Sequence, residues 1–231
     1  MKKLFKNVLN LLVVVLFLAG ISETGWATPF QNGDFETGDF MGWSGTLTDI
    51  SYGDTIVDPD SDSHFSIVPN EGPNNSNVAE VENDNDYYWQ ATLFQDFTLD
   101  ALNGSGWTMD IKFWLQWTPG DSSQDEISVQ IQDTGVTDSL DLLAGITDSD
   151  LMDGTWVTQD ITDFAQTWGG QDVELLFRIS DNNEQDGKHD SLLIDNISFQ
   201  QHPAPVPEPS TVVLLGFGLA GIVGLRKKGV F

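Results

Sequence analysis

Between residues 28 and 200 apolar and polar positions alternate with a period of two, which is typical of β-strands. The clearest case is residues 109–117, where every second position is large and apolar: Met109, Ile111, Phe113, Leu115 and Trp117. Similar alternation at 127–131 and 173–179 predicts two more strands, and further inner faces are expected from Leu93, Phe97 and Leu99 and from Leu193, Ile197 and Phe199. The pattern predicts an all-β antiparallel sandwich with a single core, with short helices only at 140–144 and 161–167.

Both ends of the chain depart from this pattern. Three Lys within the first six residues precede an apolar run over 8–21, and small residues stand at positions 25 and 27. This order predicts a secretory signal peptide over residues 1–27, cleaved after Ala27. A permanent anchor is disfavoured because the run is shorter than the roughly 20 residues that a membrane span requires. At the other end, residues 201–206 begin a Pro-rich segment, which predicts an extended tether.

The last 25 residues resemble a known sorting signal. Pro207, Glu208 and Pro209 precede an apolar stretch over 210–225, which ends at the basic cluster Arg226, Lys227 and Lys228. This order resembles the PEP-CTERM protein-sorting domain of Gram-negative bacteria over residues 207–231. The alternative is a simple C-terminal anchor, held by its basic end in the cytoplasm.

The PEP-CTERM resemblance implies a route out of the cell. An exosortase, a membrane transpeptidase-like enzyme, would recognise the tag and remove the short apolar sorting helix. The protein would be exported through the inner membrane to the cell surface or extracellular matrix, and anchored in that membrane only transiently by this transmembrane helix. Such proteins often occur in organisms that make extracellular polysaccharide and biofilm.

Composition excludes several classes of function. Residues 28–209 hold 3 Lys or Arg against 35 carboxylates, within a chain of net charge −27. Nucleic-acid binding is excluded because it depends on cationic side chains that replace the counterions of the phosphates. The chain has no Cys, which excludes disulfides, thiolate zinc sites and thiol nucleophiles.

Three segments of residues 28–200 resemble the galactose-binding-like jelly rolls, the fold of many carbohydrate-binding modules. They are the segment 32–43, which begins Asn32-Gly33-Asp34-Phe35-Glu36, the segment 91–97, and the segment 192–199, which contains Ile194-Asp195-Asn196-Ile197. The resemblance implies a jelly roll and a structural Ca²⁺ that joins the opening segment to the closing strand. Glu36 and Asp195 would be its carboxylates, completed by Asp34 and backbone carbonyls. The alternative is that Glu36 and Asp195 hydrogen-bond backbone groups at strand ends.

Sugar binding is the function that the aromatic residues favour. Aromatic rings stack on the C–H faces of sugars, and polar side chains around the ring bind the hydroxyls. Alternation places Trp114 outward beside Lys112 and Gln116, and neighbouring strands are expected to add Gln130 and Gln132 to the same surface. Tyr87, Tyr88 and Trp89 form a second aromatic group, whereas we expect the following residues to pack in the core or at a sheet edge: Trp43, Trp117 and Trp156.

Catalysis has little support in the sequence. The segment 58–63 begins like a calcium-binding EF-hand loop, but it has Ser63 at the sixth position, where the loop needs Gly, and Pro69 at the twelfth, where it needs Glu. The segment 181–187 also lacks the Glu, because Leu192 stands at its twelfth position. Both are expected to be solvated acidic loops. His189-Asp190-Ser191 is expected to be a polar loop rather than a catalytic triad. The sequence therefore favours a non-enzymatic carbohydrate-binding protein; the alternatives are a structural matrix protein without a specific ligand and a glycan-active enzyme.

Overall fold

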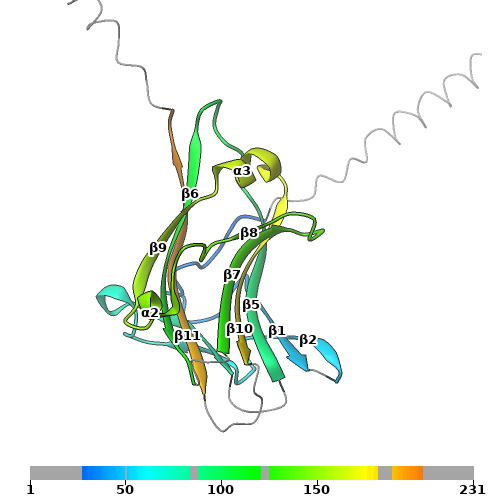
Figure 1. Cartoon of the computed structure of the whole chain (residues 1–231), viewed down its shortest axis with the longest axis vertical. Helices are drawn as coiled ribbons and strands as arrows, with labels where there is room; N and C mark the ends of the chain where they lie inside the picture. The colour runs from blue at the N-terminus through cyan, green and yellow to red at the C-terminus, as the bar shows by residue number, and fades with distance from the viewer. Residues whose placement is uncertain (1–27, 50, 84–87, 121–124, 182–188, 205–231) are drawn as a thin grey trace, which may run out of the picture.

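The computed structural model describes residues 28–49, 51–83, 88–120, 125–181 and 189–204 (Figure 1). Two antiparallel sheets pack face to face. Sheet A has the strand order β2-β1-β5-β10-β7-β8, and sheet B has the order β3-β4-β11-β6-β9. This arrangement confirms the all-β antiparallel jelly-roll sandwich. The expected signal helix and sorting helix lie outside the described residues.

The strands have the following bounds. Sheet A consists of β1 (Ser44–Asp49), β2 (Gly53–Val57), β5 (Tyr88–Thr98), β7 (Asp125–Asp133), β8 (Ser139–Asp141) and β10 (Asp172–Asp181). Sheet B consists of β3 (Phe65–Val68), β4 (Val78–Asn83), β6 (Thr108–Thr118), β9 (Thr155–Asp160) and β11 (Asp190–His202). Three short helices are η1 (Pro73–Asn75), α2 (Asp148–Leu151) and α3 (Thr162–Trp168). Within the described ranges, no helix has the length and apolar character needed to cross a membrane.

The core lies between the sheets, where the alternating apolar residues meet. All five inward residues of β6, Met109 to Trp117, are buried, and so are the four of β10, Val173 to Ile179. Burial of these side chains removes apolar area from water, which is the main favourable contribution to folding. The expected inner faces of β5, β6 and β10 and the short helix at 161–167 are confirmed.

The last strand differs from its expected pattern because it contains a β-bulge. The pairing of β11 with β6 shifts between Asp195 and Ser198, and Asn196 within the bulge has a positive φ of 54°. One extra residue moves every later side chain to the opposite face. Leu192 and Ile194 therefore face the core before the bulge and Ile197 faces it afterwards, so the inward placement of Leu193 is wrong.

Two expected boundaries also change. The segment at 140–144 is not a helix, because β8 covers its first residues and turns follow. Strand β11 continues to His202, which pairs with Thr108 of β6. Gln201 and His202 therefore belong to sheet B rather than to the Pro-rich tether.

The irregular opening segment, residues 28–43, docks against the bulge of β11. The Ile197 N–H donates to the Gly33 carbonyl at 2.8 Å, and a Cβ at position 33 would lie 2.6 Å from the Ile197 carbonyl oxygen. Gly33 therefore permits an approach that a side chain would block. This contact places Asn32 and Asp34 at the border of the outer face of sheet B.

Candidate ligand-binding site

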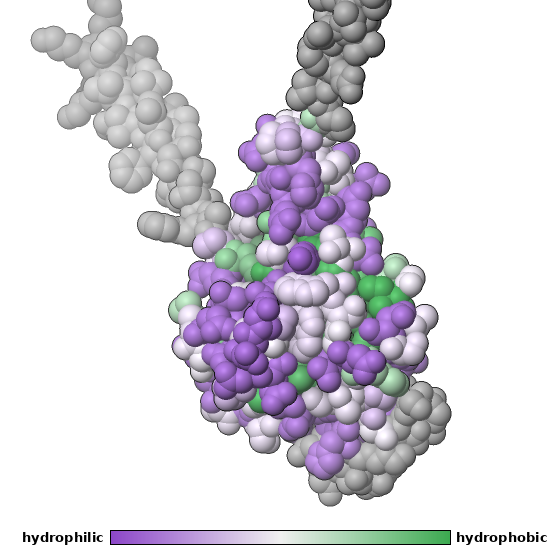
Figure 2. All heavy atoms as spheres, turned by 90° about the vertical axis from the view of Figure 1, so that its left-hand side faces the viewer, coloured by the Kyte–Doolittle hydropathy of each residue, from purple (hydrophilic) through white to green (hydrophobic). Residues whose placement is uncertain are grey.

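A hollow of about 410 Å³ lies on the outer face of sheet B. We call it the outer-face hollow; its polar and aromatic lining consists of Phe30, Asn32, Asp34, Lys112, Trp156, Asn196, Ser198 and Gln200. Figure 2 shows this side of the molecule, where residues of intermediate hydropathy gather in the middle of the face among hydrophilic ones. The volume and the mixed lining fall within the range of small-molecule sites.

Trp156 supplies the aromatic wall of the hollow. Its side chain is 44% exposed, and Nζ of Lys112 lies 4.3 Å from the centroid of its ring. A cation over an aromatic face is attracted to the electrons of the ring, so Lys112 holds the indole in place. Trp156 therefore lies on the edge strand β9 and not in the core, which is one of the two positions expected for it. In β9 only Val157 is buried, so period-two alternation around it places Trp156 and Thr158 outward.

Trp114 lies on the same outer face, directly opposite Trp156 in the pairing of β6 with β9. Its side chain is only 8% exposed, so the expectation of a solvent-exposed Trp114 is wrong. The turn before β9 covers it: a Cβ at Gly154 would lie 2.4 Å from Cζ2 of the Trp114 ring, and Gly154 has a φ of +76°. Trp114 therefore packs beneath this turn, beside Trp156.

The other expected sugar contacts do not come together. Lys112 lines the hollow, whereas Gln116 lies near Gly154 under the same turn as Trp114. Gln130 and Gln132 belong to β7 of sheet A, on the opposite side of the sandwich, where Gln132 Nε2 donates to Oε1 of Glu174 at 2.6 Å. Their expected place beside Trp114 is wrong, because alternation identifies a face of a strand but not the sheet to which it belongs.

Four lining residues were missed in the sequence: Asn32, Asn196, Ser198 and Gln200. Asn32 belongs to the irregular opening segment, where no periodicity indicates a direction. The other three lie in or after the bulge of β11, which reverses the faces. The Asn-Gly and Asp-Asn pairs in the two resembling segments were the available signal for these positions.

The structure brings Glu36 close to Asp195. Asp195 is fully buried beneath the loop that carries η1, and its carboxylate accepts hydrogen bonds from the Ser76 hydroxyl and from the backbone and side-chain nitrogens of Asn196. Burial and the negative charge of Glu36 together raise the pKa of Asp195 to about 6, against the lowering effect of its hydrogen bonds from Ser76 and Asn196. The second carboxylate, Glu36, accepts from the Asn77 N–H at 2.9 Å.

These contacts match the hydrogen-bonding alternative, yet the donor set also fits a cation. A carboxylate offers about four lone-pair positions, of which Asp195 uses three and Glu36 one in these contacts. Asp34 is exposed and accepts from the Glu36 N–H at 3.4 Å, so it adjoins Glu36 in the chain turn. Two adjacent carboxylates, one of them buried, are oxygen ligands of the kind that Ca²⁺ takes.

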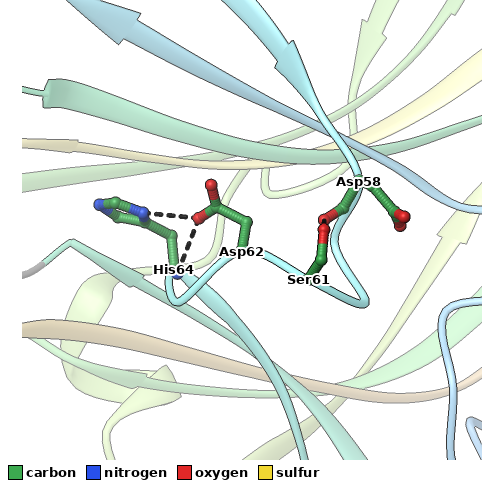
Figure 3. Close-up of polar contacts among 4 residues, drawn as sticks. All are labelled: Asp58, Ser61, Asp62 and His64. Carbon is green, nitrogen blue, oxygen red and sulfur yellow. Dashed lines mark hydrogen bonds and ion pairs between the residues drawn. The ribbon is translucent and has the colours of Figure 1, made fainter.

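The loop between β2 and β3 uses its polar groups to hold its own shape (Figure 3). His64 Nδ1 lies 2.8 Å from Oδ1 of Asp62, while the Ser61 hydroxyl donates to the Asp58 carbonyl oxygen at 3.2 Å. In Figure 3 the serine turns toward Asp58 and away from the histidine ring, so these side chains form no hydrolytic triad.

The other acidic and histidine motifs are dispersed as well. His189 is exposed, Asp190 faces the interior, and the Ser191 hydroxyl donates to Oε1 of Glu80 at 2.8 Å. Of the acidic segment 181–187, Asp181 is described; it is buried at the end of β10, so its expected solvent exposure is wrong. The rest of that segment, and the aromatic side chains at 87–89, lie outside the described residues.

Comparison with known proteins identifies one sequence motif. Residues 205–228 match the family model of the PEP-CTERM protein-sorting motif. The PEP-CTERM motif indicates an exported protein that is sorted to the cell envelope. These residues lie outside the described ranges, as does the expected cleavage site at Ala27. No curated protein matches the chain.

Several solved structures are similar in fold. Tailspike protein 4 of bacteriophage CBA120 has a TM-score of 0.46 and 14% identity to this chain. The similar region covers 76% of this chain but only 22% of the tailspike chain. A carbohydrate-binding module of the β-sandwich superfamily has a TM-score of 0.40 and 13% identity, covering 77% of this chain and 64% of the module's. The Stig cyclase FisC from Fischerella sp. TAU has a TM-score of 0.45 and 16% identity, covering 78% and 98%. Similarities at this level assign no function to the chain.

Proposed function

We propose that this protein is a non-catalytic, polysaccharide-binding component of the cell surface or extracellular matrix, and that the outer-face hollow binds the sugar. The observation that carries the proposal is the half-exposed indole of Trp156 beside Lys112 in a hollow lined by amide, hydroxyl and carboxylate groups. An indole face stacks on the apolar face of a sugar ring, and these polar groups offer both donors and acceptors to its hydroxyls.

The chemistry of the lining argues against glycan hydrolysis at this site. The usual mechanism requires two carboxyl groups that flank the scissile bond. Among the described residues that line the hollow, Asp34 is the one that carries a carboxylate. The proposal is therefore binding without cleavage.

The charge of the chain favours a neutral glycan. Residues 28–209 carry 35 carboxylates and 3 Lys or Arg, so an anionic polysaccharide is repelled, the more so at low ionic strength. A panel of immobilised neutral and acidic polysaccharides, incubated with the purified protein, tests the proposal. We expect retention on a neutral polysaccharide; retention on none of the panel would favour the structural role without a specific ligand.

The Pro-Glu-Pro tag leads to the first prediction, which concerns processing. In a host with the matching exosortase, secreted protein should lack the C-terminal residues through Phe231, because the enzyme recognises the tag and removes the apolar helix. Intact-mass measurement of the secreted protein checks this. Glu208→Ala should leave the protein in the inner membrane, whereas Glu71→Ala, at an exposed site far from the tag, should not. Secreted protein that still carries Phe231 would contradict the prediction.

We also propose a structural Ca²⁺ between the opening segment and the closing strand, held by Glu36, Asp195 and backbone carbonyls, with Asp34 beside them. The support is the proximity of Glu36 to the buried Asp195 carboxylate. In the absence of Cys, such an ion would join two parts of the chain that are about 160 positions apart in sequence.

The second prediction tests this ion with Glu36→Gln, which keeps the length of an exposed side chain and removes its charge. We expect the affinity for Ca²⁺ at this site to fall about 10- to 100-fold, with little change in the melting temperature of the metal-free protein. Calorimetric titration of chelator-treated protein measures the affinity. Asp39→Asn in the same opening segment is the matched control; equal Ca²⁺ binding by wild type and Glu36→Gln would leave only the hydrogen-bonding role.

A further inference from the structure

Four polar side chains lie between the sheets at one end of the sandwich, where strands otherwise present apolar residues to the core. Asp125 begins β7 and pairs in register with Asp181 at the end of β10, in sheet A. Asp190 begins β11 and pairs in register with Asn83 at the end of β4, in sheet B. Cross-strand partners point to the same side of a sheet, and burial shows that this side is the interior for both pairs. The two pairs therefore face each other across the sandwich.

The three aspartates form a compact group, which we call the inter-sheet acid cluster. All three side chains are buried, and one carboxylate oxygen from each lies within 4.8 Å of the others. Burial, the charges of Asp125 and Asp181 and a side-chain hydrogen bond with Asp125 together raise the pKa of Asp190 to about 7, against the lowering effect of a hydrogen bond from the Gly120 N–H at 2.6 Å. Buried like charges repel each other, so this arrangement stores an electrostatic cost that a cation would remove.

Asn83 provides an independent indication that a ligand belongs here. Its side chain is 1% exposed, and neither Nδ2 nor Oδ1 has a hydrogen-bond partner among the described residues. Buried polar groups almost always have a partner, because an unsatisfied one costs the full loss of its hydration. This amide lies beside Asp190, on the side of β4 that faces the cluster.

The cationic side chains of the described ranges are engaged elsewhere. Lys112 stacks on Trp156 outside sheet B, and Nε of Arg178 donates to the Thr92 hydroxyl on the outer face of sheet A. The cluster lies in the space between the sheets, so these two side chains lie on other faces than the cluster.

We propose that Asp125, Asp181 and Asp190, together with Oδ1 of Asn83, bind a Ca²⁺ ion between the two sheets. Carboxylate and amide oxygens are hard ligands, and Ca²⁺ takes roughly six to eight of them in flexible geometry. Mg²⁺ fits less well, because it demands a strict octahedron and retains several waters, which a buried site with four protein groups disfavours. The ion joins β7 and β10 of sheet A to β4 and β11 of sheet B. This site is separate from the one proposed at Glu36 and Asp195, which lies outside sheet B.

Calorimetric titration of chelator-treated protein with CaCl₂ tests the proposal. Wild type should bind one Ca²⁺ ion more per chain than Asp181→Asn, whether or not Glu36 and Asp195 hold another ion. The Asp181→Asn variant should lose at least about 100-fold in affinity at this site, because a neutral amide replaces a charged carboxylate ligand. An unchanged number of bound ions in this variant, or no Ca²⁺ binding by wild type, would overturn the proposal.

Asn83→Leu separates metal binding from packing. The substitution removes a buried amide that has no hydrogen-bond partner among the described residues, so it should raise the melting temperature of the metal-free protein. It also removes the Oδ1 ligand, so it should weaken Ca²⁺ binding at this site about tenfold or more. Lower metal-free stability with unchanged Ca²⁺ affinity would overturn the proposal. Mg²⁺ at equal concentration should raise the melting temperature less than Ca²⁺; an equal rise would indicate a general ionic effect and contradict the assignment.

The matched control is Asp133→Asn, at the opposite end of β7. Asp133 is buried as well, but its carboxylate accepts hydrogen bonds from Gly135, Thr137 and Asp138. Its replacement should lower the melting temperature by the same amount with Ca²⁺ and with chelator. Asp181→Asn should instead reduce the difference between those two conditions; if both variants behave alike, the cluster is structural only.

Discussion

Replacement of Trp156 with Ala is expected to weaken polysaccharide binding about 5- to 150-fold while the protein stays folded. A stacked aromatic contact contributes roughly 1–3 kcal/mol, by analogy with bases on aromatic side chains, and this range of free energy corresponds to that change in affinity. The side chain is 44% exposed and stacks with Lys112, so the loss of stability should not exceed about 1 kcal/mol. Trp156→Phe should retain part of the affinity, because a smaller ring remains.

The measurement is affinity electrophoresis or calorimetry with the neutral polysaccharide that the protein retains, with melting curves in parallel. Tyr52→Ala is the matched control, because Tyr52 is an aromatic residue that is 90% exposed at the turn between β1 and β2, away from the hollow. Tyr52→Ala should bind as wild type does. Full affinity in Trp156→Ala would show that the sugar binds elsewhere, and the outer face of sheet A, which carries Gln130 and Gln132, would then be the next surface to test.

Trp114→Ala is expected to destabilise the domain by about 3–5 kcal/mol, the usual cost when a buried Trp or Phe is truncated. Trp114 is buried between the outer face of β6 and the turn at Gly154, so truncation leaves a cavity there and removes the support beneath Trp156. Alternation alone implies the reverse, since it places Trp114 in solvent, where truncation would cost little.

Denaturant unfolding followed by tryptophan fluorescence measures this effect, with Trp156→Ala as the matched control on the neighbouring strand. The two residues are register partners in the pairing of β6 with β9, yet only Trp114 should matter for stability and only Trp156 for direct sugar contact. Trp114→Phe should recover more than half of the lost stability, because most of the cavity is refilled. A wild-type unfolding midpoint for Trp114→Ala would mean that the Gly154 turn does not cover the ring.

Much of the fold follows from local pattern. The five inward residues of β6 and the four of β10 alternate without interruption, so hydrophobic burial selects one register for each strand. The sorting motif at 205–228 is likewise a property of the linear sequence, because its residues follow one another in a fixed order, and the family model recognises it without reference to any fold. Both kinds of information are contained within about ten to twenty-five consecutive residues.

The site depends on contacts that sequence periodicity does not encode. The bulge at Asn196 reverses the faces of β11, which brings Asn196, Ser198 and Gln200 to the hollow and sends Leu193 away from the core. The turn at Gly154 buries Trp114 and leaves Trp156 exposed. The assignment of β7 to sheet A separates Gln130 from Lys112.

The sequence by itself therefore determined the C-terminal sorting motif, the all-β class and the inner faces of the regular strands. Only the tertiary structure decided which outward residues meet in a hollow, and that Asn83 lies beside Asp190 and across the sandwich from Asp125 and Asp181. The physical reason is that alternation reports on which side of a strand a residue lies, whereas a binding site depends on what covers that side. This is set by bulges, turns and strand order, which bring together residues more than 100 positions apart.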